Sequence, residues 1–140
     1  MFSIIIPTYN NLAYLKLCLH SINKNSEHNH EILVHVNEGN DGTLKYLDNL
    51  KIRYTYSKEN AGVCYAFNEA AKLATKEYLV LGHDDMYFCP NWDTEFKYAL
   101  NKIGHKNFFL SGTMVQHFNG LINLDCGSNP QTFDEKKLLE

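Results

Sequence analysis

The sequence predicts an α/β fold in which a mainly parallel sheet of Rossmann type is flanked by helices and followed by a C-terminal β-hairpin region. Four short apolar runs, at 2–7, 31–36, 51–56 and 77–82, have the composition of strands. The segments between these runs carry apolar residues at helical spacing. Because crossovers from strand to helix to strand are right-handed and return in the same direction, neighbouring strands are expected to be parallel.

The first strand and the first helix form the clearest pair. The run FSIIIP (2–7) is rich in β-branched residues and ends at a proline, a pattern typical of a strand buried on both faces. After it, apolar residues recur at helical spacing from Leu12 to Ile22, with Asn10 or Asn11 as the N-cap. The sequence therefore predicts a strand that leads directly into a helix.

The alternation of strands and helices continues through the middle of the chain. Each later strand is short, and each later helix shows one apolar stripe. The predicted elements are a strand at 31–36, a helix at 41–50, a strand at 51–56, a helix at 59–74, a strand at 77–82 and a helix at 91–104.

Beyond residue 104 the pattern changes to strands that are joined by a turn. The dipeptide Asn119-Gly120 is a strong hairpin signal, and the segment 132–140 begins a helix. No internal repeat or linker divides the chain of 140 residues. We therefore expect a single domain over 1–140.

Composition excludes several classes of protein. Hydrophobic residues make up 44% and charged residues 21%, which argues against disorder. The net charge is −3 and no Lys/Arg cluster occurs, so we expect no nucleic-acid partner. The four cysteines show no C-x-x-C pair, and no apolar run is long enough for a transmembrane segment. These features favour a cytoplasmic protein.

Polar loops follow all four predicted strands. They are PTYN (7–10), NEGNDG (37–42), ENAG (59–62) and HDDM (83–86). Since the carboxyl ends of parallel strands meet at one edge of a sheet, these loops are expected to outline a cleft there.

The phosphate-binding glycine motifs of other α/β folds are missing, because the chain has neither G-x-G-x-x-G after the first strand nor G-x-x-x-x-G-K-[ST]. If the cleft binds a nucleotide, its diphosphate needs another source of positive charge. The adjacent Asp84 and Asp85 would hold a divalent metal, Mn²⁺ or Mg²⁺, that supplies it. Taken alone, adjacent aspartates after a strand are more often a solvated turn than a metal site.

These segments resemble family 2 glycosyltransferases, which have the GT-A fold. SIIIPTYNNLAYLKLCLHSI looks like the family's opening strand and helix, and EILVHVNEGNDGT looks like its second strand and acidic loop. NAGVCYAFNEAAKLATKEYLVL is similar to the family's N-x-G…A-x-N helix, and HDDM to its metal motif, the DXD motif. The four segments occur in the family's order and spacing over about the first hundred residues.

The resemblance implies a nucleotide-sugar donor, expected to be a UDP-sugar, that is bound through Mn²⁺ or Mg²⁺. It also implies inverting transfer of the sugar to an acceptor hydroxyl. Asp85 would ligate the metal, and Asp84 would reach the metal or the ribose. The residues implied to bind the nucleotide sugar are Pro7, Thr8, Tyr9, Asn37, Glu38, Asn60, Gly62 and Asp84.

The chain also departs from the family's pattern. An ungapped match from Glu31 makes Asn37 the base reader, whereas matching the glycine of the loop makes it Glu38. Gly82 stands where many members have the first acid of the metal motif. Members continue into an acceptor-binding region that supplies a general base, and nothing in 105–140 matches that base. We therefore expect a chain that is truncated relative to the full family, and we assign no catalytic residue.

Two other functions fit parts of the sequence. A truncated or inactive module that binds nucleotide sugar without turnover would explain the short chain and the missing base. A nucleotidyltransferase also uses metal-binding acids on an α/β sheet, but it would need a Gly-rich, basic loop where PTYN (7–10) stands.

Overall fold

A computed structural model of the protein describes residues 1–117 and 122–140. The chain divides into two compact units, residues 1–90 and residues 91–140. All the residues of the pocket described below belong to the first unit. The single domain expected over 1–140 stays a prediction.

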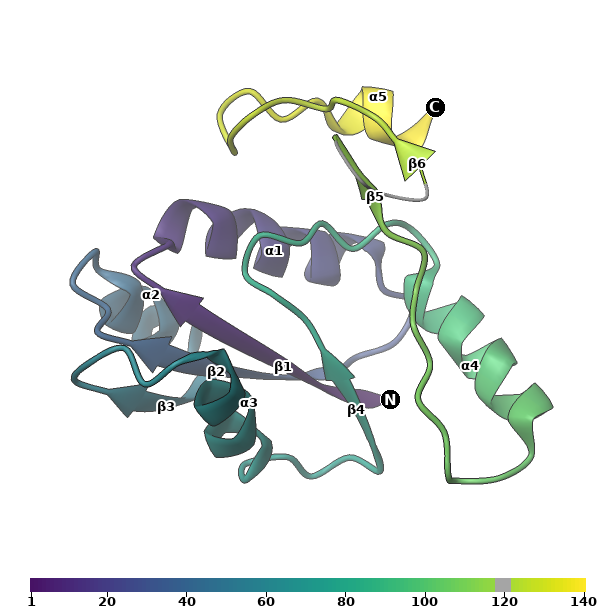
Figure 1. Ribbon diagram of the computed structural model, residues 1–140, viewed down its shortest axis with the longest axis horizontal. Helices are drawn as coiled ribbons and strands as arrows, with labels where there is room; N and C mark the ends of the chain where they lie inside the picture. The colour runs from purple at the N-terminus through teal and green to yellow at the C-terminus, as the bar shows by residue number, and fades with distance from the viewer. Residues whose placement is uncertain (118–121) are drawn as a thin grey trace. The chain divides into compact units, whose positions relative to one another are not determined.

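The first unit is built on a four-stranded sheet in which all neighbouring strands are parallel (Figure 1). The strands are β1 (Phe2–Tyr9), β2 (Glu31–Asn37), β3 (Arg53–Ser57) and β4 (Tyr78–Leu81), and their order across the sheet is β3-β2-β1-β4. The chain moves outward from β1 to β3 and then returns to the other side of β1. The predicted parallel α/β sheet is confirmed, and its topological switch point lies between β1 and β4.

Strand β1 is the centre of this sheet because it pairs with β2 on one side and β4 on the other. Ile5, for example, lies level with Leu33 of β2 and Leu81 of β4. The side chains of Ile4, Ile5 and Ile6 are all 0% exposed. A strand that is covered on both faces needs apolar residues at every position, which explains the unbroken run in the sequence.

Helices cover both faces of the sheet. These are α1 (Leu12–Asn25), α2 (Thr43–Leu50) and α3 (Val63–Ala71), and Figure 1 shows α1 and α3 on opposite faces. Helix α3 packs against Ile5 and Leu33 in a buried cluster. The crossovers that carry α1 and α3 thus account for the two-sided burial of β1.

Several element boundaries differ by one to four residues from the prediction, and two of these differences lie at the carboxyl edge of the sheet. Strand β1 continues past Pro7 to Tyr9, because a proline has an extended φ and lacks only one donor of the ladder. Helix α3 begins at Val63, since Gly62 before it has a positive φ of 85° that a helix does not accept. Both changes lengthen the segments that reach the carboxyl edge of the sheet.

The described residues of the second unit, 91–117 and 122–140, form two helices and two very short strands. Its elements are α4 (Trp92–Ile103), β5 (Val115–Gln116), β6 (Ile122–Asn123) and α5 (Glu135–Leu139). Helix α4 ends at Gly104, which has a φ of 70°. A glycine in this left-handed conformation is the predicted helix stop.

The predicted C-terminal β-hairpin is wrong in its strand direction. Strands β5 and β6 pair in parallel, whereas the strands of a hairpin are antiparallel. The expected turn at Asn119-Gly120 lies outside the described residues. An Asn-Gly dipeptide predicts a hairpin reliably only when it is flanked by strands with alternating apolar residues. Strands β5 and β6 have only two residues each, which is too short for such a pattern.

Candidate functional site

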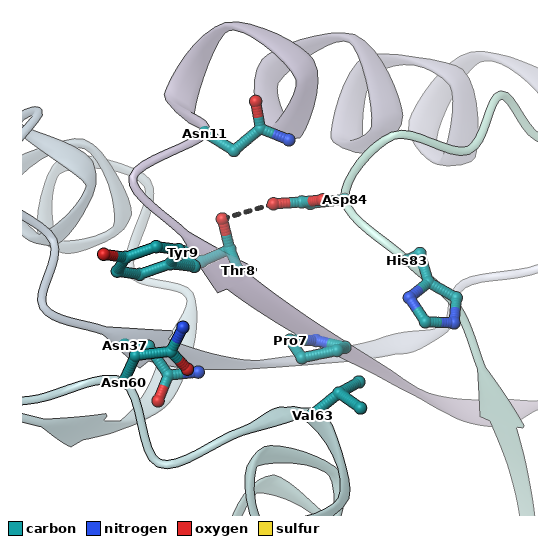
Figure 2. A pocket seen from close by; sticks show the side chains of 9 residues that line it. All are labelled: Pro7, Thr8, Tyr9, Asn11, Asn37, Asn60, Val63, His83 and Asp84. Carbon is teal, nitrogen blue, oxygen red and sulfur yellow. Dashed lines mark hydrogen bonds between the residues drawn. The ribbon is translucent and has the colours of Figure 1, made fainter.

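A pocket of ≈ 230 Å³ opens at the carboxyl edge of the sheet, beside the switch point (Figure 2). Residues from the ends of β1 and β2 and from the loops after β3 and β4 surround it, so the structure brings together all four polar loops. Its lining consists of Pro7, Thr8, Tyr9, Asn11, Asn37, Asn60, Val63, His83 and Asp84.

Most of the residues expected to bind a nucleotide sugar line this pocket. Those that do are Pro7, Thr8, Tyr9, Asn37, Asn60 and Asp84. The other two, Glu38 and Gly62, and the expected metal ligand Asp85 lie next to lining residues in the chain and are not part of the lining.

The lining also contains Asn11, Val63 and His83, to which sequence reasoning gave other roles or none. Asn11 is the residue before α1 but makes no side-chain capping bond, and its side chain instead forms a hydrogen bond with Asp84. Val63 belongs to the apolar stripe of the helix predicted over 59–74, which should face the core, but its side chain is exposed. The sheet topology could have predicted that Asn11 and Val63 line the pocket. Both lie at helix N-termini, and at the carboxyl edge of a parallel sheet these termini face the ligand.

Asp84 is held across the switch point by Thr8. The Thr8 hydroxyl donates a hydrogen bond of 2.6 Å to Oδ2 of Asp84, and this bond joins β1 to the loop after β4 (Figure 2). Burial raises the pKa of Asp84, and the negative charge of Asp85 acts in the same direction. Hydrogen bonds from Thr8 and Asn11 oppose this increase. The charge of His83 also acts to lower the pKa, so Asp84 is a partly buried carboxylate for which burial outweighs its stabilising neighbours.

Asp85 is the exposed neighbour of this carboxylate. Among the residues that the structure describes, no group of three or more His, Cys, Asp or Glu side chains is arranged to hold a metal ion. Magnesium and manganese sites that serve nucleotides commonly use one or two carboxylates, with phosphate oxygens and waters as the other ligands. The Asp84–Asp85 pair fits that donor set.

Helix α1 fixes the segment that carries these acids. The backbone N–H of Phe88 donates to the Ser21 hydroxyl at 2.9 Å, and Nδ2 of Asn25 donates to the Phe88 carbonyl at 2.7 Å. Closer to the acids, the Cys18 thiol donates to the carbonyl of His83 at 3.4 Å. Burial, with the charges of Asp84 and Asp85, raises the pKa of Cys18 to about 12.

The packing of this segment also explains Gly82. A Cβ atom at this position would lie 3.2 Å from the ring of Phe88 and 3.7 Å from Ile6. The ring of Phe88 would have to shift by a few tenths of an ångström to admit a side chain at this position.

The loops after β1 and β2 are bound to each other. Nδ2 of Asn10 donates to Oε2 of Glu38 at 3.1 Å, and the backbone N–H of Asn40 donates to Oδ1 of Asn10 at 2.8 Å. Asp41 accepts a bond of 2.7 Å from the N–H of Leu12, the first residue of α1. The carboxylate of Glu38 is therefore engaged with a neighbouring loop.

Asn37 lies at the end of β2 and is only 3% exposed. Its Oδ1 accepts a hydrogen bond of 2.9 Å from the backbone N–H of Ala61. Asn60 makes a similar local bond, because its Oδ1 accepts from the N–H of Gly62 at 3.0 Å. These two amides shape the loop that leads into α3, and Figure 2 shows them together at the end of the pocket below Tyr9.

A buried histidine lies behind Asn37. Nδ1 of His35 is 2.7 Å from the hydroxyl of Thr55, and Nε2 is 3.1 Å from the hydroxyl of Ser57. Burial lowers the pKa of His35, whereas its hydrogen bond with Asn37 and the charge of Glu69 act to raise it. His35 thus connects β2 to β3 and interacts with the pocket residue Asn37.

Among the described residues, no helix combines the length and the apolar character that crossing a bilayer requires.

Solved structures support the fold assignment. The chain is similar to S. aureus TarS 1-349 in complex with UDP, with a TM-score of 0.71 and 23% sequence identity over 86% of this chain and 37% of that chain. It is also similar to a mannosyltransferase from Pyrobaculum calidifontis in complex with GDP-Man and Mn²⁺, with a TM-score of 0.59 and 24% identity. That match covers 67% of this chain and 30% of the other. These similarities confirm a GT-A-like fold.

Sequence relatives point the same way. An uncharacterized glycosyltransferase of Rickettsia conorii is 39% identical over 118 residues, which are 79% of this chain and 19% of the relative. A protein of Bacillus subtilis, also an uncharacterized glycosyltransferase, is 34% identical over 60% of this chain and 23% of its own length. The chain therefore spans about a fifth of the length of these relatives.

The family profile described as glycosyl transferase family 2 matches residues 3–135. This match extends from β1 through the pocket residues to the start of α5. It confirms the resemblance inferred from the four loop segments, and the chain belongs to glycosyl transferase family 2.

Proposed function

We propose that this chain binds the donor of a glycosyltransferase reaction, a nucleoside-diphosphate sugar, in the pocket beside the switch point. The observation that carries the proposal is the hydrogen bond between Thr8 and Asp84, which holds a carboxylate at the rim where residues from all four loops meet. UDP is the nucleotide that the family resemblance implies, and the similar TarS structure contains UDP.

The two ends of the pocket suggest different roles. Tyr9, Asn37 and Asn60 would contact the base and ribose, with Pro7 and Thr8 between them and the acids. Asp84 and Asp85 would hold a divalent cation, Mn²⁺ or Mg²⁺. When bound there, this cation would neutralise the diphosphate and stabilise it as the leaving group.

The reaction that we propose is inverting transfer of the sugar to an acceptor hydroxyl. In such a reaction the hydroxyl attacks the anomeric carbon on the side opposite the departing diphosphate. The residues of this chain serve the donor side of that step. They orient the nucleotide, and Thr8 keeps the Asp84 carboxylate in place.

Isothermal titration calorimetry tests the proposal. UDP, GDP and CDP are each titrated with Mn²⁺ or with chelator into the wild type and into Asp85→Ala. We expect binding that requires Mn²⁺ and that weakens by at least about tenfold in Asp85→Ala, since a metal ligand is lost. Asp48→Ala, which removes an exposed carboxylate on α2, is the control with the same charge change.

Binding of equal strength in chelator, or an Asp85→Ala variant equal to the wild type, would refute the metal-bridged donor site. Hydrolysis of a UDP-sugar by the chain, followed as UDP release, separates an enzyme from a binding module. Nucleotide binding without any release of UDP would favour the module.

A further inference from the structure

The side-chain amide of Asn37 has one orientation that its surroundings fix. A backbone N–H can only donate, so the Asn37 atom that lies 2.9 Å from the N–H of Ala61 is the oxygen. The carbonyl side of the amide is therefore occupied by the N–H of Ala61.

The NH₂ group of Asn37 is consequently the part that the pocket meets. In the described part of the chain, no fully buried side-chain nitrogen or oxygen atom lacks a hydrogen-bond partner. Within those residues, no protein acceptor forms a hydrogen bond with Nδ2 of Asn37. If this atom were fully buried, it would be such an exception, so it must be accessible to solvent. Since Asn37 lines the pocket while being 3% exposed, its remaining accessible surface faces the pocket.

The alternative base reader, Glu38, is engaged elsewhere. Its carboxylate accepts hydrogen bonds from Nδ2 of Asn10 at 3.1 Å and from Nδ2 of Asn40 at 3.3 Å. Glu38 also has a φ of 62°, which turns the chain away from the strand direction after Asn37. Of the two candidates, only Asn37 belongs to the pocket lining.

We propose that Asn37 determines the base preference of this site by presenting a hydrogen-bond donor, so that the pocket binds CDP at least as tightly as UDP. This inference rests on the proposed nucleotide-binding function. It concerns the ring nitrogen at position 3 of a pyrimidine. In cytosine this nitrogen is an acceptor that an amide N–H can satisfy, whereas in uracil it carries a hydrogen and would face a second donor.

A carboxylate at position 37 would have the opposite preference. An aspartate has two acceptor oxygens, so one could keep the bond from Ala61 and the other would face the pocket. That second oxygen would accept from the N–H of uracil and repel the acceptor edge of cytosine. The substitution Asn37→Asp therefore exchanges a donor for an acceptor while retaining the contact that fixes the loop.

The test is calorimetric titration of the wild type and of Asn37→Asp with UDP and with CDP, all in Mn²⁺. The two nucleotides share the ribose and the diphosphate, so the ratio of their dissociation constants isolates the base. In the wild type we expect CDP to bind with a dissociation constant no higher than that of UDP. In Asn37→Asp we expect the ratio to shift toward UDP by about tenfold, as one gained and one lost hydrogen bond predict.

Tighter binding of UDP than of CDP to the wild type by tenfold or more would overturn the inference, even if the variant fails to fold. An unchanged ratio in a folded Asn37→Asp would overturn it as well. If neither nucleotide binds the wild type in Mn²⁺, the proposed function itself fails. If both nucleotides bind but UDP binds at least tenfold more tightly than CDP, the proposed function stands and only the role of Asn37 is refuted.

Discussion

Glu31 offers a quantitative test of how the sheet is held together at the end opposite the pocket. Its carboxylate accepts hydrogen bonds from the Ser3 hydroxyl of β1, from the backbone N–H and the hydroxyl of Thr75 at 2.8 and 3.0 Å, and from Arg53 of β3 at 2.9 Å. Three other segments of the chain thus converge on this side chain, which is 14% exposed. We choose Glu31→Gln because it preserves the shape and replaces one acceptor oxygen by a donor.

The expected loss of stability follows from these contacts. A hydrogen bond to a charged group contributes about 1.5–3 kcal/mol, and in the variant an NH₂ group would face the donors of Ser3 or Thr75. Arg53 is 51% exposed, so its ion pair with Glu31 adds little. Thr75 is also exposed to water, which competes for its bonds. We therefore expect Glu31→Gln to lower the free energy of unfolding by about 1.5–2 kcal/mol at pH 7.

The pH dependence gives this prediction a second signature. Burial acts to raise the pKa of Glu31, but the hydrogen bonds from Ser3 and Thr75 and the charge of Arg53 outweigh it and lower the pKa below 4.5. A carboxyl whose pKa is lowered by folding stabilises the protein above its unfolded-state pKa. That contribution is lost as the pH falls through the native value. The difference between the wild type and Glu31→Gln should therefore shrink in acid.

Urea denaturation followed by circular dichroism at pH 7 and at about pH 3.5 measures both effects. Glu59→Gln, at an exposed position, is the matched control and should leave the stability within about 0.5 kcal/mol of the wild type. Equal stability of the wild type and Glu31→Gln at pH 7 would refute the reasoning. A deficit of the same size at both pH values would refute it too, because the effect would then not come from the charge.

Three further predictions concern the site and its supports. Thr8→Val, which removes the donor to Asp84, should lower the free energy of urea unfolding by about 1.5–3 kcal/mol, and a change below about 0.5 kcal/mol would contradict the importance of that bond. Gly39→Ala should lower the free energy of unfolding by about 2 kcal/mol in the same assay. The residue has a φ of 71°, and a Cβ atom at this position would lie 2.8 Å from a methyl group of Val36. A variant as stable as the wild type would show that the loop adapts. Iodoacetamide at pH 8 should modify the exposed Cys64 and spare Cys18, whose pKa is raised to about 12, and equal labelling in peptide mass spectra would disprove that burial.

The sequence predicted the sheet well because the strand signals are local. The run from Phe2 to Pro7 and the strand that begins at Glu31 each contain three consecutive apolar residues, Ile4–Ile6 and Ile32–Val34, and helical stripes separate all four strands. Right-handed crossovers then leave few topologies. The carboxyl edge could be identified without coordinates, and with it six of the residues that line the pocket.

The contacts inside the pocket could not be predicted in this way, because they depend on strand register. Ile5 pairs with Leu81, so Thr8 and Asp84 each lie three residues beyond this pair and meet at 2.6 Å. Nothing in a local window fixes the alignment of two strands that are separated by most of the first unit. The orientation of the Asn37 amide likewise depends on a backbone N–H from another loop.

The two ends of the pocket are supported by separate sets of hydrogen bonds. Asn37 is held by Ala61 and by the neighbouring His35, whereas Asp84 is held by Thr8, in a loop that Cys18 fixes through its thiol. None of these bonds has a residue in common with a bond of the other set. Substitutions at the two ends should therefore act additively on nucleotide affinity. Because the two sets are independent, a single substitution at Asn37 could change which nucleotide base is preferred during evolution. The residues that would bind the diphosphate would then stay unchanged.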